Sequence, residues 1–554
     1  MTLSVGTRIE VLGTLRCLGP VHIGGWDTTV EADLSVARDG AGIPCLPGTS
    51  IAGALRAYLT GIDRFEPHLN ALFGHIVPYT TVGSPSWIRV DDAHLLDTDV
   101  TPVVRDGVGI DRRSATAAQG FLYTRQMLPV GTRFAVRLVA DTPTTATAPQ
   151  YPGGWPALVR DAVDTLVAGL THARIPFGAG RGHGLGLVRL DECDIRTADL
   201  SDPAGLIAWL TGTAPPRTRL PATPDTKRDD LPADGHLRIT IDWRPVGPLL
   251  VRDSLPGTVV DTLPLTDTQV DGTVRLLLPG SSIRGAIRAH AERIVRTLRC
   301  QDAPPDLGDT LRTPPPGVDL LFGAAPASSR GHCGNREDNE RRGRRGALSV
   351  ADCRSVAALS VADWNTVVTI HPAQGAPTGE EREEREDRET RNTERGTALG
   401  ALHQHLDAIN TAVSLGVSDH VAIDRWTGGA GDHRLFSVLE PDSTVGWEPI
   451  SISVDVARLR RHPNPAGAAP AALALPLLLL VLRDLADGWL RLGYGGTRGR
   501  GHIEVTRVRF DGQGLDAPWQ SLTGTTLDAV LADPPPDITA AMSSWAGTFE
   551  KVSA

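Results

Sequence analysis

The chain contains one phrase twice, and this repeat limits its fold more than any other feature. "LPGTSIAGALRAYL" begins at Leu46 and "LPGSSIRGAIRAHA" begins at Leu278. A long internal repeat is typical of duplicated structural units. With 554 residues, the chain is long enough for two to four domains. The repeat therefore predicts at least two related domains.

Five further pairs of similar segments occur in the same order along the chain. A shared order of this kind is not expected by chance, and it predicts two copies of one domain. The pairs are "LGPVHIGG" and "VGPLLVRD", "LFG" at Leu72 and Leu321, "IRVDDA" and "LSVADC", "VGIDRRSATAAQGFLYTRQM" and "VAIDRWTGGAGDHRLFSVLE", and "FGAGRGHGLGLVRL" and "GYGGTRGRGHIEVTRV".

A segment rich in proline and charge separates the two copies. Residues 211–235 show no apolar period, which is typical of a linker. We predict a first domain over 1–210 and a second over 236–554. The second copy has extra chain over about 324–419, with Gly/Arg-rich and Glu/Arg-rich parts. An exposed helix and a disordered segment are both compatible with the Glu/Arg-rich part, and we favour a mobile insertion.

The order of patterns within each copy predicts an α+β fold. Each copy begins with a segment in which apolar and polar residues alternate, which indicates a strand, and the helical spacing of apolar residues after Pro-Gly indicates a helix. We expect the hydroxyls of Thr49, Ser50, Ser281 and Ser282 to cap these helices. Further strands, another helix and a last strand follow. A βαββαβ core of the ferredoxin-like or RNA-recognition type fits this order, with helices over one sheet face.

Composition excludes some classes of protein. The net charge of −10 argues against a globally basic nucleic-acid binder, although local arginine clusters can still bind phosphate. The longest apolar stretch is too short for a membrane span and contains Pro470 and Pro476. Six cysteines in so long a chain, with no secretory signal, predict reduced thiols and a cytoplasmic protein.

A glycine-rich loop precedes the last strand of each copy. "GAGRGHG" is similar to a dinucleotide-binding fingerprint, but it does not open a helix, and no Walker sequence is present. Backbone amides and the guanidinium groups of Arg181, Arg498 and Arg500 suit phosphate binding. The alternative is a tight turn at the entry to a strand, and both interpretations are compatible.

Together these motifs resemble the RAMP superfamily of CRISPR proteins, and within it the Cas-seven-type backbone subunits of type III effector complexes. The resemblance covers nearly the whole chain, once per half. It implies a fused pair of domains, each with a β-hairpin thumb, that bind guide RNA (crRNA) and meet the paired target RNA in antiviral defence. It also implies further backbone subunits, a large polymerase-like subunit and an end-capping subunit as partners, and no membrane.

The resemblance also implies which residues contact RNA. Pro-Gly followed by hydroxyls leaves N–H groups at a helix N-terminus, which suits a phosphate, whereas the alternative is an ordinary capped helix. Glycine within the helix permits close backbone approach. The predicted RNA-binding residues are Ser50, Gly53, Arg56, Arg112, Arg181, Ser282, Arg284, Arg288, Arg425, Arg498 and Arg500.

Family subunits that cleave target RNA use an aspartate shortly before the Pro-Gly helix. Asp33 lies at this position, with Asp39 as a second acid, and Asp261 and Asp267 repeat the six-residue step. We expect a metal-dependent endoribonuclease in which a ribose 2′-hydroxyl attacks the adjacent phosphate, with Mg²⁺ or a similar divalent cation. His22 lies near the loop, but a packed histidine is the commoner case.

Two other functions remain open. If these aspartates only satisfy loop amides, the chain is a structural guide-RNA-binding subunit. A stand-alone endoribonuclease that processes guide RNA is a third interpretation. A zinc site formed by His332, Cys333 and Cys353 is a further candidate, although no CxxC pair supports it.

Overall fold

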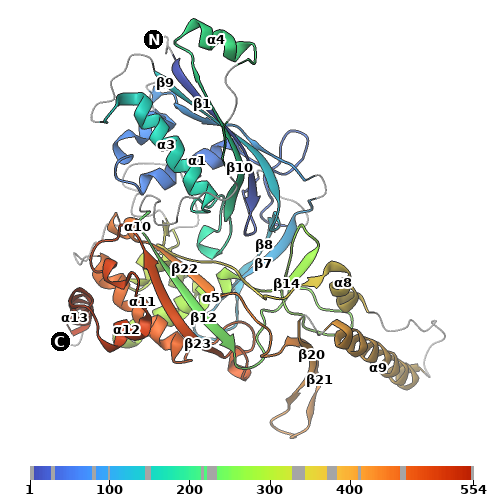
Figure 1. Ribbon diagram of the computed structural model, residues 1–554. Coiled ribbons are helices and arrows are strands. Elements are labelled where there is room, and N and C mark those ends of the chain that lie inside the picture. The colour runs from blue at the N-terminus through green and yellow to red at the C-terminus, as the bar shows by residue number, and fades with distance from the viewer. Residues whose placement is uncertain are drawn as a thin grey trace.

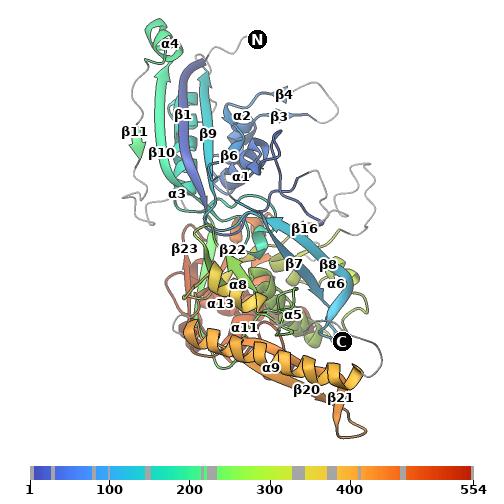
Figure 2. The same cartoon turned by 90° about the vertical axis from the view of Figure 1, so that its right-hand side faces the viewer.

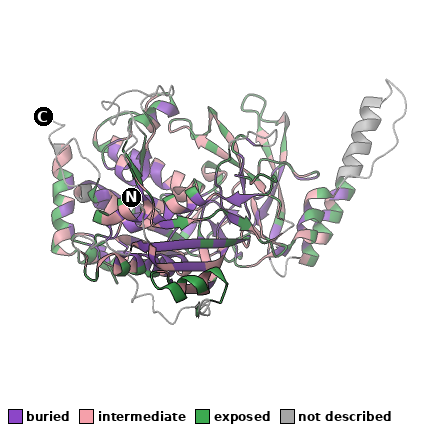
Figure 3. Cartoon of the chain, turned by 90° about the horizontal axis from the view of Figure 1, so that it is seen from above, coloured by how far each residue is buried: buried purple, intermediate pink, exposed green. Residues whose placement is uncertain are grey.

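The chain forms two lobes, one per repeat, as the computed structural model shows (Figure 1). Each lobe has its own hydrophobic core, formed mainly by residues that its sheets bury against their helices (Figure 3). Buried cores of this kind follow from the strand and helix periodicities. The structure describes residues 5–25, 32–77, 83–97, 100–143, 151–213, 218–220, 234–326, 343–370, 383–409, 413–461 and 470–550.

The first domain has a ferredoxin-like core. In its antiparallel sheet the strand order β10-β1-β9-β5 is that of a βαββαβ unit, and the two helices cover one face. The α+β prediction is confirmed. The core elements are β1 (Val5–Cys17), α1 (Gly48–Thr60), β5 (Ile88–Val90), β9 (Arg133–Pro143), α3 (Gly154–Thr171) and β10 (Val188–Asp199). The other elements are β2 (Cys45–Leu46), η1 (Glu66–His68), α2 (Leu69–Phe73), β3 (His75–Ile76), β4 (Gly83–Ser84), β6 (Ala93–Leu95), η2 (Arg181–His183), α4 (Pro203–Leu210) and β11 (Thr218–Leu220).

The second domain repeats this core with the order β23-β12-β22-β17. Helices α5 and α11 take the places of α1 and α3. The core elements are β12 (His236–Pro245), α5 (Gly280–Leu298), β17 (Leu348–Val350), β22 (Ile450–Asp455), α11 (Pro470–Ala486) and β23 (Ile503–Gly512). The others are β13 (Thr266–Thr268), β14 (Thr273–Leu278), α6 (Leu307–Arg312), α7 (Val318–Phe322), β15 (Gly323–Ala324), β16 (Arg344–Arg345), β18 (Cys353–Arg354), β19 (Leu359–Ser360), α8 (Val361–Thr369), α9 (Glu383–Ile409), α10 (Val456–Arg460), η5 (Gly496–Arg498), η6 (Gln520–Leu522), α12 (Leu527–Ala532) and α13 (Pro536–Glu550).

The extra chain of the second copy is not one continuous insertion. Strand β17, within the predicted segment 324–419, pairs with β22 in the main sheet. The additional chain therefore lies before and after this strand. The later part contains α8 and the long helix α9, which lies beside the second hairpin at one end of the lobe (Figure 2). Ala398, Leu402 and Leu406 join α9 to the core.

Each domain carries a β-hairpin at the position of its "IDR" segment. The first consists of β7 (Val103–Ile110) and β8 (Ala117–Met127), and the second of β20 (Leu415–Ile423) and β21 (Ala430–Pro441). The first hairpin extends from the upper lobe across the lower one (Figures 1 and 2). The second projects from the lower lobe at the far end.

The repeated phrase forms the start of α1 and α5, but its hydroxyls do not cap these helices. The N-cap residues are Pro47 and Pro279, and neither makes a side-chain cap. The first helical N–H, of Gly48 or Gly280, instead donates to a carboxylate of the next strand connection. Asp92 accepts from the N–H of Gly48 over 2.7 Å in the first copy, and Asp352 accepts from the N–H of Gly280 over 2.8 Å in the second. The expected hydroxyl caps are therefore wrong.

Candidate RNA interface

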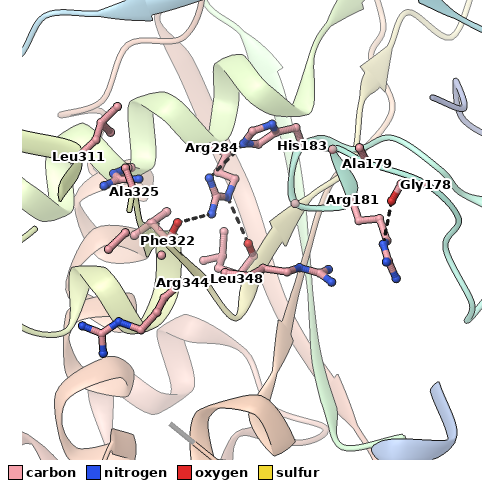
Figure 4. A pocket seen from close by; sticks show the side chains of 17 residues that line it. Gly178, Ala179, Arg181, His183, Arg284, Leu311, Phe322, Ala325, Arg344 and Leu348 are labelled. Carbon is pink, nitrogen blue, oxygen red and sulfur yellow. Dashed lines mark hydrogen bonds between the residues drawn. The ribbon is translucent and has the colours of Figure 1, made fainter. Parts of the chain in front are cut away.

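A cavity of about 440 Å³ lies between the two domains. The glycine loop of the first domain forms one wall, with residues 178–183, and α5 with residues 322–325 and 344–348 forms the other. Figure 4 shows Arg284 of one wall meeting His183 of the other, while Arg344 points away from them. Its lining contains five arginines and one histidine, and among the described residues that line it there is no carboxylate. The basic residues are Arg181, Arg284, Arg288, Arg344, Arg345 and His183.

Protein contacts hold Arg284 at the centre of this cavity. Its Nη2 donates to the Phe322 carbonyl over 2.8 Å and its Nε to the Leu348 carbonyl over 3.2 Å. Its Nη1 lies 3.3 Å from Nε2 of His183, across the domain boundary (Figure 4). None of these contacts neutralises the positive charge, so the cavity is built to attract an anion.

The titration of these groups reflects the same crowding of positive charge. Burial, followed by Arg288 and Arg345, lowers the pKa of Arg284 to about 10. The surrounding protein desolvates part of the Arg345 side chain, and this, followed by neighbouring arginines, lowers the pKa of Arg345 to about 10, although the residue keeps an exposed surface. Burial and then Arg284 lower the pKa of His183 to about 4. An anion in the cavity would relieve this repulsion.

The predicted residues of α1 do not line this cavity. Arg56 donates to the carbonyl of Gly74 over 3.0 Å and to Asn70 over 2.6 Å, so it anchors the "LFG" turn. Ser50 lies in the first turn of the helix, as does Ser282 of α5. A side-chain carbon added at Gly53, or at its counterpart Gly285, would meet no described atom within 4 Å, so this helix surface is open.

Two predicted RNA contacts are used inside the protein. Arg112 of the first hairpin donates through Nε to Glu292 of α5 over 2.9 Å, and its side chain is only 13% exposed. Arg500 is buried and pairs with Glu440 and His420 of the second hairpin. Both side chains join parts of the fold, which leaves them poorly placed to contact RNA.

The other two predicted arginines of the second copy are exposed. Arg498 lies over the ring of Phe436, 5.9 Å from its centre, and Arg425 lies at the tip of the second hairpin. The glycine loops match in their contacts, because Gly178 packs on the His22 carbonyl as Gly493 packs on that of Leu250. The two glycine loops therefore have the same backbone arrangement but carry their arginines at different positions.

The two predicted catalytic aspartates occupy matching positions. Oδ2 of Asp33 accepts from the backbone N–H of Thr124 over 2.8 Å and from its hydroxyl over 3.0 Å. Oδ2 of Asp261 accepts from the N–H and hydroxyl of Ser437 over 2.7 and 3.0 Å. Both partners lie on the second strand of a hairpin. The structural correspondence therefore includes Asp261, despite the longer loop in the second copy.

The second acids of these loops are structural. Oδ1 of Asp39 accepts from two N–H groups of its own turn, and its other oxygen lies 3.7 Å from His94. The matching Asp267 is buried and pairs with Arg354 over 2.5 Å. In each copy the acid contacts a side chain of another strand, His94 of β6 or Arg354 of β18, so it stabilises the fold next to the predicted site.

The local chemistry of Asp33 suits a charged carboxylate. The Thr124 hydrogen bonds, first from its N–H and then from its hydroxyl, lower the pKa of Asp33. A carboxylate with a lowered pKa is a weak proton acceptor at neutral pH. Within the described residues Oδ1 makes no hydrogen bond and the side chain is exposed. An exposed carboxylate is the kind of oxygen ligand that Mg²⁺ takes in proteins, where the ion usually keeps several waters.

Other candidate groups have structural contacts. His22 is buried, and its Nδ1 lies 2.7 Å from the carbonyl of Gln126. Cys353 is buried, and its thiol donates to the Glu448 carbonyl; burial and Glu448 raise the pKa of Cys353. His332 and Cys333 lie outside the described residues, so the zinc prediction stays a prediction. No group of three metal-ligating side chains occurs in the described part of the chain.

Sequence reasoning missed several residues of these sites. Arg344 and Arg345 come from a Gly/Arg-rich run, which was the available signal for the cavity. The hydroxyls of Thr124 and Ser437 occupy the same position in two aligned segments, and this could have identified the partners of the aspartates. His183 had no signal beyond its place in the glycine loop.

The comparison with known families decides the classification. A family model described as the RAMP superfamily matches residues 14–189 and 244–504, one region in each repeat. The chain belongs to the RAMP superfamily. A search of curated proteins finds no match.

Membership places this RAMP protein among CRISPR-associated RNA-binding subunits. It agrees with the two ferredoxin-like cores and with the arginine-lined cavity between them. None of the described helices combines the length and apolar character that crossing a membrane requires.

Proposed function

We propose that this RAMP protein is a Cas-seven-type backbone subunit of a type III CRISPR complex. It binds crRNA and cleaves the paired target RNA at Asp33 and Asp261. The observation that carries the RNA-binding part is the cavity between the repeats, which five arginines line without a carboxylate among the described lining residues. Phosphate groups are the natural ligand of such a cluster, because guanidinium forks match their oxygens.

The matching surroundings of the two aspartates support the cleavage part. Thr124 and Ser437 hold Oδ2 of Asp33 and Asp261 in the same way, on hairpins that directly precede β9 and β22 in the chain. A contact chain links the first aspartate to the cavity, because Arg125 follows Thr124 and reaches Gly180 of the glycine loop. Two cleavage sites per chain follow from the repeat.

The reaction is an internal attack of RNA on itself. The ribose 2′-oxygen bonds to the adjacent phosphorus and the 5′-oxygen leaves, giving a 2′,3′-cyclic phosphate and a 5′-hydroxyl. The 2′-hydroxyl proton passes to solvent, and the leaving oxygen takes a proton from solvent. A divalent cation held by Asp33 would neutralise charge on the phosphate. The protein residues mainly fix the in-line geometry of the RNA.

Substitution of each aspartate in the assembled complex tests the cleavage. Asp33→Ala should abolish one set of cuts in a complementary target RNA, and Asp261→Ala the other set. Asp39→Asn is the matched control, because Asp39 lies in the same loop but stabilises its own turn. Both sets of cuts should persist in the Asp39→Asn variant.

The same experiment separates the alternatives. If the double variant still cuts at both positions, the chain is a structural crRNA-binding subunit and the nuclease assignment is wrong. If the purified chain alone cuts a guide-repeat hairpin, the protein processes guide RNA instead. Loss of crRNA binding on Arg284→Ala, measured separately, tests the cavity.

A further inference from the structure

Each hairpin carries a second aspartate directly across from the residue that holds the proposed catalytic aspartate. In the first hairpin, Asp106 of β7 pairs in register with Thr124 of β8. In the second, Asp419 of β20 pairs in register with Ser437 of β21. Side chains of residues that pair in this way lie on the same face of a hairpin. Asp106 is therefore on the same face as the Thr124 hydroxyl that contacts Asp33.

The backbone brings these cross-strand pairs close together. The N–H of Thr124 donates to Asp33 and its carbonyl accepts from the N–H of Leu34, so neither group points to β7. Opposite residues of this kind, which share no backbone hydrogen bond, have Cα atoms about 4.5 Å apart, the closer of the two spacings in an antiparallel pair. The second hairpin has the same arrangement around Ser437.

The repeat keeps this aspartate although its neighbours change. Asp106 and Asp419 each precede the aspartate of the "IDR" segment by five positions. Arginine and glycine flank Asp106, whereas serine and histidine flank Asp419. Both side chains are exposed, and within the described residues neither makes a hydrogen bond or an ion pair. The requirements of the fold therefore do not explain why both copies carry an acid here.

An exposed apolar pair lies next to this aspartate in each hairpin. Val108 pairs with Leu122 in the first hairpin, and Val421 pairs with Leu435 in the second. All four side chains are exposed. Because each valine follows the aspartate by two positions along its strand, both lie on the same face. A face with an apolar pair beside a free carboxylate is suited to the sugars and bases of a nucleic acid.

The first of these faces offers acceptors rather than donors near the proposed site. The Thr124 hydroxyl donates to Oδ2 of Asp33 and accepts from the N–H of Asp33 over 2.8 Å. Among these three side chains, the oxygens that remain available belong to the carboxylates of Asp33 and Asp106. A phosphate is itself an anion, and the carboxylate of Asp106 would repel it. The ribose 2′-hydroxyl is a donor that every RNA nucleotide carries and DNA lacks.

We infer that Asp106 and Asp419 each accept a hydrogen bond from the attacking 2′-hydroxyl, and that this contact makes the two sites specific for RNA. The base amino groups, which are the other donors of RNA, pair with the guide in a complementary target. The hydrogen bond holds the nucleophilic oxygen, while its proton still passes to solvent. The inference rests on the proposed function, because it concerns the target RNA at the same two sites.

A series of target RNAs, each with one deoxyribose, tests this inference in the assembled complex. Affinity is measured by competition in EDTA, without reference to cleavage. In the natural complex, deoxyribose at the nucleotide before each cut should weaken binding about ten-fold, as expected for a lost hydrogen bond to a charged group. Asp106→Ala should remove this penalty at one position and Asp419→Ala at the other. Deoxyribose elsewhere in the target is the control and should have the same effect in all three complexes.

The conservative variant separates contact with RNA from a structural role. Asp106→Asn keeps one neutral acceptor and should retain part of the penalty, whereas a structural defect would weaken binding of every target equally. The inference is overturned if the penalty is the same in the natural and Asp106→Ala complexes, or if Asp106→Ala weakens all targets alike. Cuts that persist in the Asp33→Ala/Asp261→Ala complex would instead overturn the proposed cleavage, and that result is independent of the deoxyribose series.

Discussion

Arg112 of the first hairpin and Glu292 of α5 form a buried ion pair across the two domains, with 2.9 Å between Nε and Oε2. Arg288 donates to the other carboxylate oxygen over 2.7 Å. One carboxylate therefore holds a cation from each domain. The pair explains why the first hairpin lies against its neighbour while the second, with the same sequence motif, is exposed.

Loss of this carboxylate should destabilise the protein more than loss of its partner. Glu292→Ala leaves two buried arginines facing each other, and we expect a loss of about 3–5 kcal/mol in the free energy of unfolding. Arg112→Ala leaves Glu292 paired with Arg288 and should cost about 1–3 kcal/mol. The exposed Arg425→Ala is the control, within about 0.5 kcal/mol. Urea denaturation measures all three, and equal losses for Glu292→Ala and Arg425→Ala would contradict the role of this ion pair.

The hydroxyl of Thr124 should affect cleavage at one site only. Thr124→Val removes one of the hydrogen bonds that lower the pKa of Asp33, so this pKa should rise and the acid limb of the cleavage rate should move to higher pH. We expect the rate of the first cut to fall about ten-fold. Ser437→Ala should slow only the second cut. Each rate is measured by quantifying the two products, and equal slowing of both cuts would argue against separate sites.

Arg284 should contribute to RNA binding through its charge. Arg284→Ala should weaken binding of crRNA about ten-fold, and the dependence of log affinity on log salt should become shallower by about 0.7, the value for one phosphate of a single strand. Arg160→Ala removes an exposed arginine of α3 outside the cavity and is the control. Filter binding over a salt series gives both quantities. An unchanged slope would show that this arginine meets no phosphate.

His183 should make stability depend on pH. The pKa of His183 is about 4 in the folded protein, below the ordinary 6.5. As the pH falls, the unfolded chain therefore protonates this histidine at a higher pH than the folded protein does. The stability that neutral His183 supports is complete above about pH 6.5 and falls by about 3 kcal/mol as the pH decreases to 4. His183→Gln should show a correspondingly flatter profile in urea denaturation. Phosphate groups in the cavity should raise the pKa of His183 above this value of about 4, so crRNA should bind more tightly as the pH falls toward 4.

Two glycines of α5 should respond in opposite ways to alanine. A side-chain carbon at Gly280 would lie 2.2 Å from the Val350 carbonyl oxygen, so Gly280→Ala should cost about 2–4 kcal/mol of stability. Gly285 faces open space, and Gly285→Ala should stabilise the helix by about 0.5–1 kcal/mol. If RNA lies on this helix surface, the second variant should nevertheless bind crRNA more weakly. Thermal melting and filter binding separate the two effects.

The sequence by itself determined the two-domain organisation and the family of the fold. Six pairs of segments in one order set the same strand and helix pattern in each half, and local patterns largely decide such elements. The correspondence of Asp33 and Asp261 followed from their place before the repeated phrase. The fold family and the correspondence of the two aspartates depend on contacts between residues close along the chain or on matched positions in the repeat.

Only the tertiary structure decided what each arginine does. Arg112, Arg284 and Arg500 look equivalent in sequence, yet one joins the domains, one lies in the cavity and one anchors a loop to a hairpin. Their roles depend on which carboxylate or carbonyl another domain or element places nearby. The cap of each Pro-Gly helix likewise comes from Asp92 or Asp352, more than forty residues away. Burial makes such long-range pairings decisive, because a buried charge or N–H must find a partner wherever the fold supplies one.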